Sequence, residues 1–315
     1  NIFMIYEDES SNFLTCKFIK KNCLLQQFSD DEKVNLISQR YKKEFRISDK
    51  PQYTFFGLTQ NTKEISNRGF YKWTKDKIEN NIALYSLNTN NKIKIKSKEM
   101  DIYFTNKFSR ALILGDKTIF ENWTINIIGQ EKFNGKDNLI NSETNLTGCL
   151  TFLDIKVKNI NINSNNLHCE DSVNFIRSRG TIKNVNISNS FSDALDVDFS
   201  DLSLENINIE NAKNDCVDLS YGDYKIKSLI TNNCGDKGLS VGENSNVFVN
   251  EFFSSNSKYG AVSKDSSLTI IDKAKISNNK YCIAAYNKKQ EFAGSIIKIK
   301  EVECYGYDEK LFKDN

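Results

Sequence analysis

Carboxylates and lysines return at a fixed interval in the C-terminal half of the chain. Steps of 22 residues give two series, Asp171, Asp193, Asp215 and Lys237, and Asp196 and Asp218. Carboxyl groups held close together either share protons, because like charges raise one pKa, or bind a cation. A lysine beside them can hold an anionic group or, when its pKa is lowered, remove a proton. The pattern therefore favours acid–base chemistry or cation binding wherever the fold brings the repeats together.

The apolar residues around these positions indicate which elements must hold them. The same step gives two apolar or small columns, Val173, Leu195, Val217, Leu239, Ala261 and Ile283, and Phe175, Val197, Leu219, Val241, Ser263 and Ala285. Alternation of apolar and polar residues is typical of β-strands. It places Leu195 and Val197 inside the protein, and it places Asp196 and Asp198 on the outer face.

A second strand and a turn recur in every repeat. The step joins a second apolar column, Ile182, Leu204, Ile226, Phe248 and Ile270. A further column is predicted to form a hydrogen-bonded ladder at a turn and contains Asn189, Asn211, Asn233, Ser255 and Ser277. The strands are too close in sequence for a crossover helix, so successive repeats must stack as coils about 4.8 Å apart.

The repeat predicts an all-β fold, a right-handed parallel β-helix with 22-residue coils. The expected parts are a small N-terminal α/β domain or cap at 1–98, the β-helix at 99–306 and a C-terminal tail at 307–315. A cap is expected because an open solenoid end exposes unpaired strand edges. Ser29 followed by three acidic residues is a helix-capping pattern, which predicts a helix near residues 30–44.

Composition limits the partners. The 43 basic and 41 acidic residues nearly cancel, so the overall charge gives no reason to expect nucleic acid or an anionic membrane as a partner. No apolar run is long enough to span a membrane. The eight cysteines include no CxxC pair, which argues against a zinc ribbon, and both disulfides and buried free thiols fit their spacing.

Superposed coils bring the candidate site residues onto one outer face. The residues expected to act in catalysis are Asp193, Asp196, Asp215, Asp218, Lys237 and Lys264, and those expected to bind substrate are Asp198, Asp236, Glu243, Tyr286 and Lys288. Asp196 and Asp218 lie one coil apart, so their carboxyl groups are expected to face each other across about 5 Å, where Ca²⁺ is a possible ligand. No other cofactor is predicted.

Three uses of such a cluster stay open. Paired carboxyl groups can hydrolyse a glycosidic bond by acid and base catalysis. A lysine can instead abstract the proton α to a uronate carboxyl group. Ligation of Ca²⁺ is the third use. Among the remaining residues, the single histidine, His168, is interpreted as structural and Trp73 and Trp123 as core residues, while Lys288 and Lys289 either extend the basic end of the face or lie in a solvated loop.

The strings along these coils resemble those of the polygalacturonase family of glycoside hydrolases, which are parallel β-helices. That family carries NTD, DD, GHG and RIK motifs on successive coils, and the strings here are Phe191-Ser192-Asp193, Asn214-Asp215, Asp236-Lys237-Gly238 and Val262-Ser263-Lys264. The spacing agrees, but Asn214, Lys237 and Val262 stand where the family has aspartate, histidine and arginine. Residues 148–293 also resemble uncharacterised bacterial β-helix proteins with GDKGLSVGE, SKDSS and AAYNKKQEF segments. These resemblances imply the fold and a carbohydrate setting.

The expected function is action on an acidic, uronate-containing polysaccharide by lyase, hydrolase or epimerase chemistry in a groove on the β-helix. Such a protein is expected to be extracytoplasmic, that is periplasmic, cell-surface or secreted. The alternative is a non-catalytic module that binds glycan or protein with the same face. A third possibility is a structural spacer stiffened by Ca²⁺.

Overall fold

The computed structural model describes residues 3–7, 13–19, 22–27, 73–79, 82–87, 91–106, 109–115, 119–130 and 146–313. Contacts divide the chain into two units, Asn1–Ile65 and Ser66–Asn315. In the first unit, β1 (Phe3–Glu7), β2 (Phe13–Ile19) and β3 (Asn22–Gln27) form an antiparallel sheet. The helix expected near residues 30–44 lies outside the described residues.

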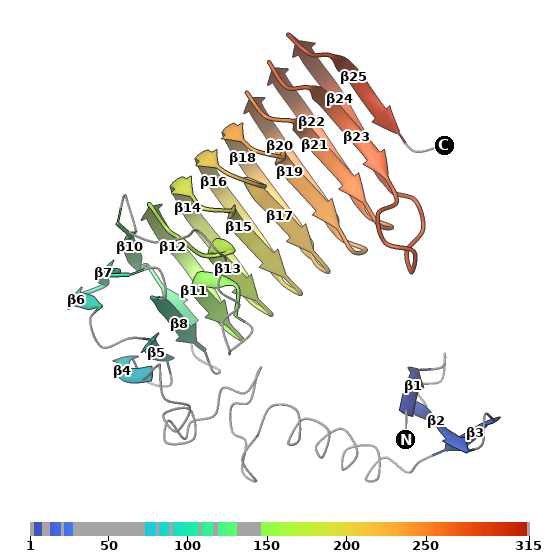
Figure 1. The fold of residues 1–315 in the computed structure, drawn as a ribbon. Coiled ribbons are helices and arrows are strands. Elements are labelled where there is room, and N and C mark those ends of the chain that lie inside the picture. Colours follow the sequence, from blue (N-terminus) through green and yellow to red (C-terminus); the bar gives the residue numbers. More distant parts are fainter. Residues whose placement is uncertain are drawn as a thin grey trace. The chain divides into compact units, whose positions relative to one another are not determined.

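The second unit is a parallel β-solenoid built from two long sheets (Figure 1). The first, here called the site sheet, contains β4 (Trp73–Glu79), β5 (Ile82–Leu87), β8 (Arg110–Leu114), β11 (Gly148–Leu153), β13 (Asp171–Ile176), β15 (Asp193–Asp198), β17 (Val217–Ser220), β19 (Lys237–Gly242), β21 (Tyr259–Lys264), β23 (Tyr281–Tyr286) and β25 (Glu309–Lys313). The predicted stack of parallel coils is therefore confirmed.

The second long sheet is here called the ladder sheet. It contains β6 (Lys92–Lys96), β7 (Glu99–Tyr103), β10 (Thr124–Ile128), β12 (Lys156–Asn165), β14 (Arg179–Ser190), β16 (Asp201–Ala212), β18 (Asp223–Cys234), β20 (Asn246–Ser255), β22 (Leu268–Ser277) and β24 (Ile296–Tyr305), with β9 (Ile119–Glu121) paired to β12. Pairing becomes parallel from β7 and β8 onwards, whereas β4, β5 and β6 pair antiparallel. Strands β4 to β6 fall within the stretch expected to be the N-terminal domain, and β25 falls within the expected tail.

The core lies between the sheets and follows the predicted columns. Leu195, Val197, Val217 and Leu239 are fully buried. Phe152 and Phe175 stack on each other from neighbouring coils at 4.3 Å between ring centroids. Trp123 is buried as expected, whereas the side chain of Trp73 lies outside those described. No helix long and apolar enough to cross a membrane occurs within the described residues.

The asparagine ladder at the turn is present for three of the expected residues. Asn211 Nδ2 donates to Asn189 Oδ1 at 3.2 Å, and Asn233 Nδ2 donates to Asn211 Oδ1 at 2.8 Å. All three residues adopt positive φ, which asparagine tolerates better than most residues. Placing Ser255 and Ser277 in this column was wrong, because the positive-φ position passes instead to Asn256 and Asn278.

The shift has a local cause. The turn after β19 carries two consecutive left-handed residues, Glu243 and Asn244, and the ladder-sheet register from β18 to β20 is 23 residues, Asp223 pairing with Asn246. The residues that continue the inner column of Ile226 are consequently Val249 and Ile271, which are fully buried. The predicted continuation of that column through Phe248 and Ile270 was wrong by one residue.

Three disulfides staple the solenoid from within. They join Cys149 to Cys169, Cys216 to Cys234 and Cys282 to Cys304, across sequence separations of 20, 18 and 22 residues. Each joins the start of a site-sheet strand to the end of the same coil, so it closes one coil on itself. Of the two possibilities for the cysteines, the structure shows disulfides for all six whose side chains are described.

Candidate functional site

Three outer columns of the site sheet carry the candidate residues. Strand register places Asp171 beside Asp193, Asp196 beside Asp218, and Asp198 beside Ser220, each pair on neighbouring coils. The third column continues from Ser220 through Gly242, and Lys264 and Tyr286 pair on the coils beyond it. The coils therefore bring together the carboxylates and lysines that the 22-residue step had aligned.

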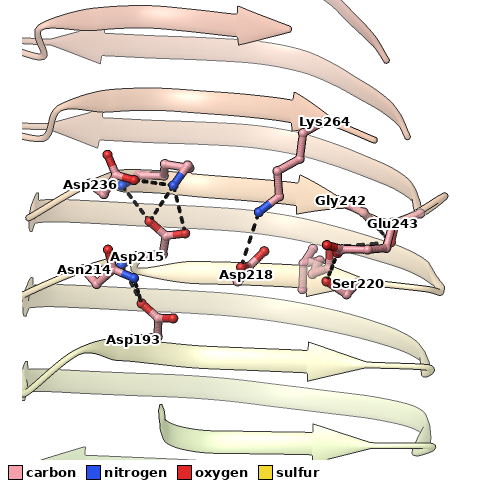
Figure 2. A network of polar contacts seen from close by, with 12 residues as sticks. Asp193, Asn214, Asp215, Asp218, Ser220, Asp236, Gly242, Glu243 and Lys264 are labelled. Atoms are coloured by element: carbon pink, nitrogen blue, oxygen red, sulfur yellow. Dashed lines mark hydrogen bonds and ion pairs between the residues drawn. The ribbon is translucent and has the colours of Figure 1, made fainter. Parts of the chain in front are cut away.

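The first column is a continuous polar chain (Figure 2). Asp193 Oδ1 accepts hydrogen bonds from Asp215 N at 2.8 Å and from Asn214 Nδ2 at 2.6 Å. Asp215 in turn accepts from Lys237, whose Nζ lies 3.2 Å from Oδ1 and 3.3 Å from Oδ2. The Lys237 ammonium also bonds to Asp236, and Lys258 pairs with the other oxygen of Asp236 at 3.2 Å.

Lys237 and Asp215 are almost inaccessible. They are 5 % and 3 % exposed, so solvent hardly screens their interaction. Burial alone would lower the pKa of Lys237, but the charge of Asp215 and the hydrogen bond with Asp236 outweigh it and raise this pKa. Lys237 is therefore an ammonium at neutral pH and does not have the character of a general base.

The second column joins two coils through a long lysine side chain. Lys264, on β21, places its Nζ 3.6 Å from Asp218 Oδ2, on β17, and only 3 % of Lys264 is exposed. Burial lowers the pKa of Lys264, but the charges of Asp218 and of other nearby carboxylates raise it by a larger amount. The net effect is a raised pKa. Asp196, one coil from Asp218, instead accepts from Asn174 Nδ2 at 2.8 Å.

Several carboxyl groups on β13 and β15 have raised pKa values and so retain their protons to a higher pH than usual. Burial and, to a smaller extent, the neighbouring charge of Asp215 together raise the pKa of Asp193 to about 8. Burial is also the main cause for Asp171, whose pKa is raised to about 7, and for Asp198, whose pKa is raised to about 6. The pKa of Asp196 is raised well above its usual value by burial and by the charge of Asp171. These groups can donate protons near neutral pH.

Of the predicted substrate-binding residues, Asp236 bonds to Lys237 within the cluster, whereas Glu243 and Tyr286 lie at its edge. Burial would raise the pKa of Glu243, but the hydrogen bonds that it accepts from Lys289 and Ser220 lower it below the usual range. Lys289 Nζ lies 2.7 Å from Glu243 Oε1. Tyr286 is half-buried at the far end of the third column, and burial raises its pKa. Glu243 is therefore a paired carboxylate and Tyr286 a neutral phenol.

Lys288 and Lys289 lie in one loop, but only the side chain of Lys289 contacts the cluster. Both backbone N–H groups donate to Asp265 Oδ1, at 2.6 and 2.7 Å, which fixes the start of the loop. The side chain of Lys288 is exposed, whereas that of Lys289 reaches Glu243. His168 stacks on Phe191 with 5.6 Å between ring centroids, in keeping with a structural role.

Four contributors to the cluster were not predicted from the sequence. They are Asn174, which donates to Asp196, Asn214, which donates to Asp193, Lys258, which pairs with Asp236, and Gly242, which leaves room for the side chain of Lys264. Asn174 lies one 22-residue step before Asp196 and was open to detection by the same alignment. Lys258 lies one 22-residue step after Asp236 and one step before Lys280, so the same alignment could have found it as well. Within the described residues, no group of three or more His, Cys, Asp or Glu side chains is arranged to hold a metal ion.

The arrangement combines two kinds of carboxyl group on one face. Asp215 and Asp218 form ion pairs with lysines, although burial outweighs Lys237 and still raises the pKa of Asp215 to about 6. The pKa values of Asp171, Asp193 and Asp196 are raised further. Such a separation is the condition under which one carboxyl group can serve as an acid while its neighbour serves as a base. No protein-family model, curated protein or solved structure matches this chain.

Proposed function

We propose that the protein cleaves a uronate-containing polysaccharide by hydrolysis on the site sheet, with aspartates as the proton-transferring groups. One observation carries this proposal. Asp196 and Asp218 are direct neighbours on adjacent coils, yet their surroundings differ: Lys264 pairs with Asp218, whereas Asp196 is held by the neutral amide of Asn174. Asp196 is therefore assigned as the general acid and Asp218 as the base or nucleophile.

The spacing of the pair favours one form of hydrolysis. Side chains on directly paired residues of neighbouring strands lie roughly 5 Å apart. Retaining glycosidases separate their carboxyl groups by about 5–5.5 Å, whereas inverting ones leave about 6.5–9.5 Å for a water molecule. The proposal therefore includes retention of configuration at the anomeric carbon, with Asp218 as the nucleophile.

The lysines support hydrolysis over elimination. Elimination with a lysine as the base requires that lysine to be uncharged, but carboxylates raise the pKa of both Lys237 and Lys264. In this proposal the two buried lysines act as fixed cations that pair with the carboxyl groups of Asp215 and Asp218.

The remaining surface is suited to an acidic sugar chain. Lys258 and Lys289 are about half-exposed and lie on the upper coils and their loop, where they can meet uronate carboxylates. Phe199 and Tyr221 lie at the ends of β15 and β17, stack at 4.6 Å between ring centroids and offer apolar surface beside the carboxyl groups. The resemblance to the polygalacturonase family and the three disulfides further support an extracytoplasmic enzyme.

The test is hydrolysis of a panel of acidic polysaccharides, read by new reducing ends and by absorbance of unsaturated products. We expect reducing ends without unsaturated products, and we expect Asp196→Asn and Asp218→Asn each to lower turnover about 100-fold or more. Asp201→Asn removes an exposed carboxylate of the ladder sheet and serves as the matched control. Unsaturated products would replace hydrolysis by elimination, and full activity in both variants would move the site elsewhere.

A non-catalytic binding module is the second candidate, and one observation favours it. Lys237 and Asp215 are buried and paired, as expected for a network that stabilises the coils rather than contacts a substrate. Binding across the panel without any product would select this candidate.

A further inference from the structure

The outer face of the ladder sheet carries two series of side-chain amides on strands β10 to β16. In the first, each amide donates to the coil below, Asn126 to Asp101 at 2.8 Å, Asn163 to Asn126 at 2.8 Å and Asn186 to Asn163 at 2.9 Å. The second runs two residues away along the same strands, from Asn161 to Thr124 at 3.3 Å, Asn184 to Asn161 at 2.7 Å and Asn206 to Asn184 at 3.0 Å. Together they form a regular grid of amides.

The solenoid itself does not require these amides. On the coils after β16, the residues that pair in line with the first series, starting from Asn208, are Ile230, Phe253 and Lys275. Those in line with the second series, starting from Asn206, are Ser228, Glu251 and Lys273. The coils after β16 pair in the same way with apolar, hydroxyl, acidic or basic side chains at these positions. The amides are therefore a local property of strands β10 to β16.

A surface hollow coincides with the grid. An open cavity of about 520 Å³ lies over β7, β10, β12, β14 and β16, and its lining residues include Asp101, Asn126, Asn163, Asn186, Asn208 and Glu210. The outer face of a regular sheet is nearly flat, so a hollow of this size can receive part of a ligand. Its floor is the first amide series.

The chemistry of the lining defines the ligand. An amide that makes one bond to each neighbouring coil uses one N–H and one oxygen lone pair, which leaves a second donor and a second acceptor. Asn126 and Asn206 differ, because their Nδ2 atoms donate a second time, to Glu99 and to the Lys183 carbonyl, each at 3.4 Å. These free groups repeat about every 4.8 Å across coils and about every 6.6 Å along strands. A polymer with closely spaced hydroxyl groups, which both donate and accept, matches such a grid.

The charge of the lining further limits which class of polymer the hollow can bind. Among the described residues, the lining contains the carboxyl groups of Asp101 and Glu210 but no lysine or arginine. Lys94 pairs with Asp101 across β6 and β7, and its Nζ lies 5.7 Å from the centre of the Tyr103 ring, so one edge of the hollow has a cation beside it. A polyanion, whether nucleic acid or polyuronate, would still meet Glu210 at the other edge without a lysine or arginine in the described lining. We propose that this hollow, here called the amide hollow, binds a neutral polysaccharide, on a different sheet from the carboxyl cluster and independently of the function proposed above.

The test is affinity electrophoresis of the full chain in native gels that contain hydroxyethylcellulose, laminarin or galactomannan, with polygalacturonate as the anionic comparison. We expect at least one neutral polymer to retard the parent protein. The double variant Asn163→Leu, Asn186→Leu should lose about tenfold or more in affinity. Asn208→Leu, which lines the hollow without donating a ladder bond within the described residues, should also weaken binding.

Asn232→Leu is the matched control. Asn232 accepts ladder hydrogen bonds from Ser255 at 2.9 Å and from Asn256 at 2.8 Å, but it does not line the hollow. It should therefore cost similar stability, as measured by thermal melting, and leave retardation unchanged. The proposal is overturned if no neutral polymer retards the parent, or if Asn232→Leu loses as much affinity as Asn208→Leu. Loss of activity in Asp196→Asn with normal retardation would show that the two faces act separately.

Discussion

Gly242 leaves open the space through which the Lys264 side chain crosses one coil to reach Asp218 (Figure 2). A Cβ atom at position 242 would lie 2.6 Å from Lys264 Cε and 3.2 Å from its Cγ. Contacts this short are not tolerated, so one of the two side chains would have to move. The ion pair between β21 and β17 therefore depends on the absence of a side chain on β19.

Gly242→Ala is expected to displace Lys264 from Asp218. The backbone at Gly242 does not have a positive φ, and the obstructing atoms belong to a flexible side chain, so the fold should accept alanine with little change in melting temperature. Without Asp218, the pKa of Lys264 should fall, because burial then dominates. Titration of the lysine Nζ resonances by NMR measures this. Gly294→Ala meets nothing within 4 Å and is the control; an unchanged Lys264 pKa contradicts the account.

Stability is expected to decrease as the pH rises from about 4 to about 8. The folded pKa of Asp193 is about 8 against an ordinary value of 3.8, so the folded state binds more protons than the unfolded state throughout this interval. The stabilisation is complete below the lower value and is lost as the pH passes the higher one. Asp171, with a pKa of about 7, acts in the same direction. Thermal midpoints across this range test the slope.

Asp193→Asn should flatten that slope, because an amide does not titrate. Asp201→Asn removes an exposed carboxylate and should leave the slope as it is. A parent protein whose melting temperature rises steadily with pH up to 8 would show that the lower coils keep their carboxyl groups ionised.

Val217→Asp is expected to prevent the solenoid from folding. Val217 is fully buried between the sheets, and an unpaired charge there should cost about 3 kcal/mol or more. Circular dichroism and thermal melting measure the effect. Lys227→Asp introduces the same residue at an exposed position of β18 and should melt like the parent. Equal melting of both variants would place Val217 outside the core.

Calcium is expected to have little effect on the parent protein and a larger one on Lys264→Met. The Lys264 ammonium already lies beside Asp218, and removing it leaves Asp196 and Asp218 as neighbours without a cation. Ca²⁺ should then raise the melting temperature of the variant, which isothermal calorimetry would register as binding. A parent protein destabilised by a chelator would instead identify a calcium site present from the outset.

The coil stack and the outward columns could be predicted from the sequence because both follow from local alternation repeated every 22 residues. Asp196 and Asp198 had to face outward once Leu195 and Val197 faced inward. The register beyond β19 could not be predicted in the same way. Its extra residue lies in the turn at Glu243 and Asn244, where backbone conformation, not apolar periodicity, sets the length.

The sequence also could not predict which lysine side chains reach across to another column or to an adjacent residue. A 22-residue step aligns Cα positions, but lysine side chains are long enough to reach one or two coils away. Lys264 thus pairs with Asp218, which lies in another column, and Lys237 contacts Asp236 in addition to its column neighbour Asp215. Burial of these pairs depends on how neighbouring side chains cover them, which no local pattern records.

The disulfides, each of which closes a single coil, give the solenoid an uneven response to mechanical force. When a chain is pulled from its ends, an ordinary coil of 22 residues can lengthen by roughly 75 Å as it unwinds. A coil closed between Cys216 and Cys234 cannot, because its 18-residue loop is bypassed by a covalent bond. The three closed coils lie near residues 149–169, 216–234 and 282–304, with open coils between them. Under tension the molecule should therefore extend in long steps separated by short ones, and its maximum length should increase on reduction.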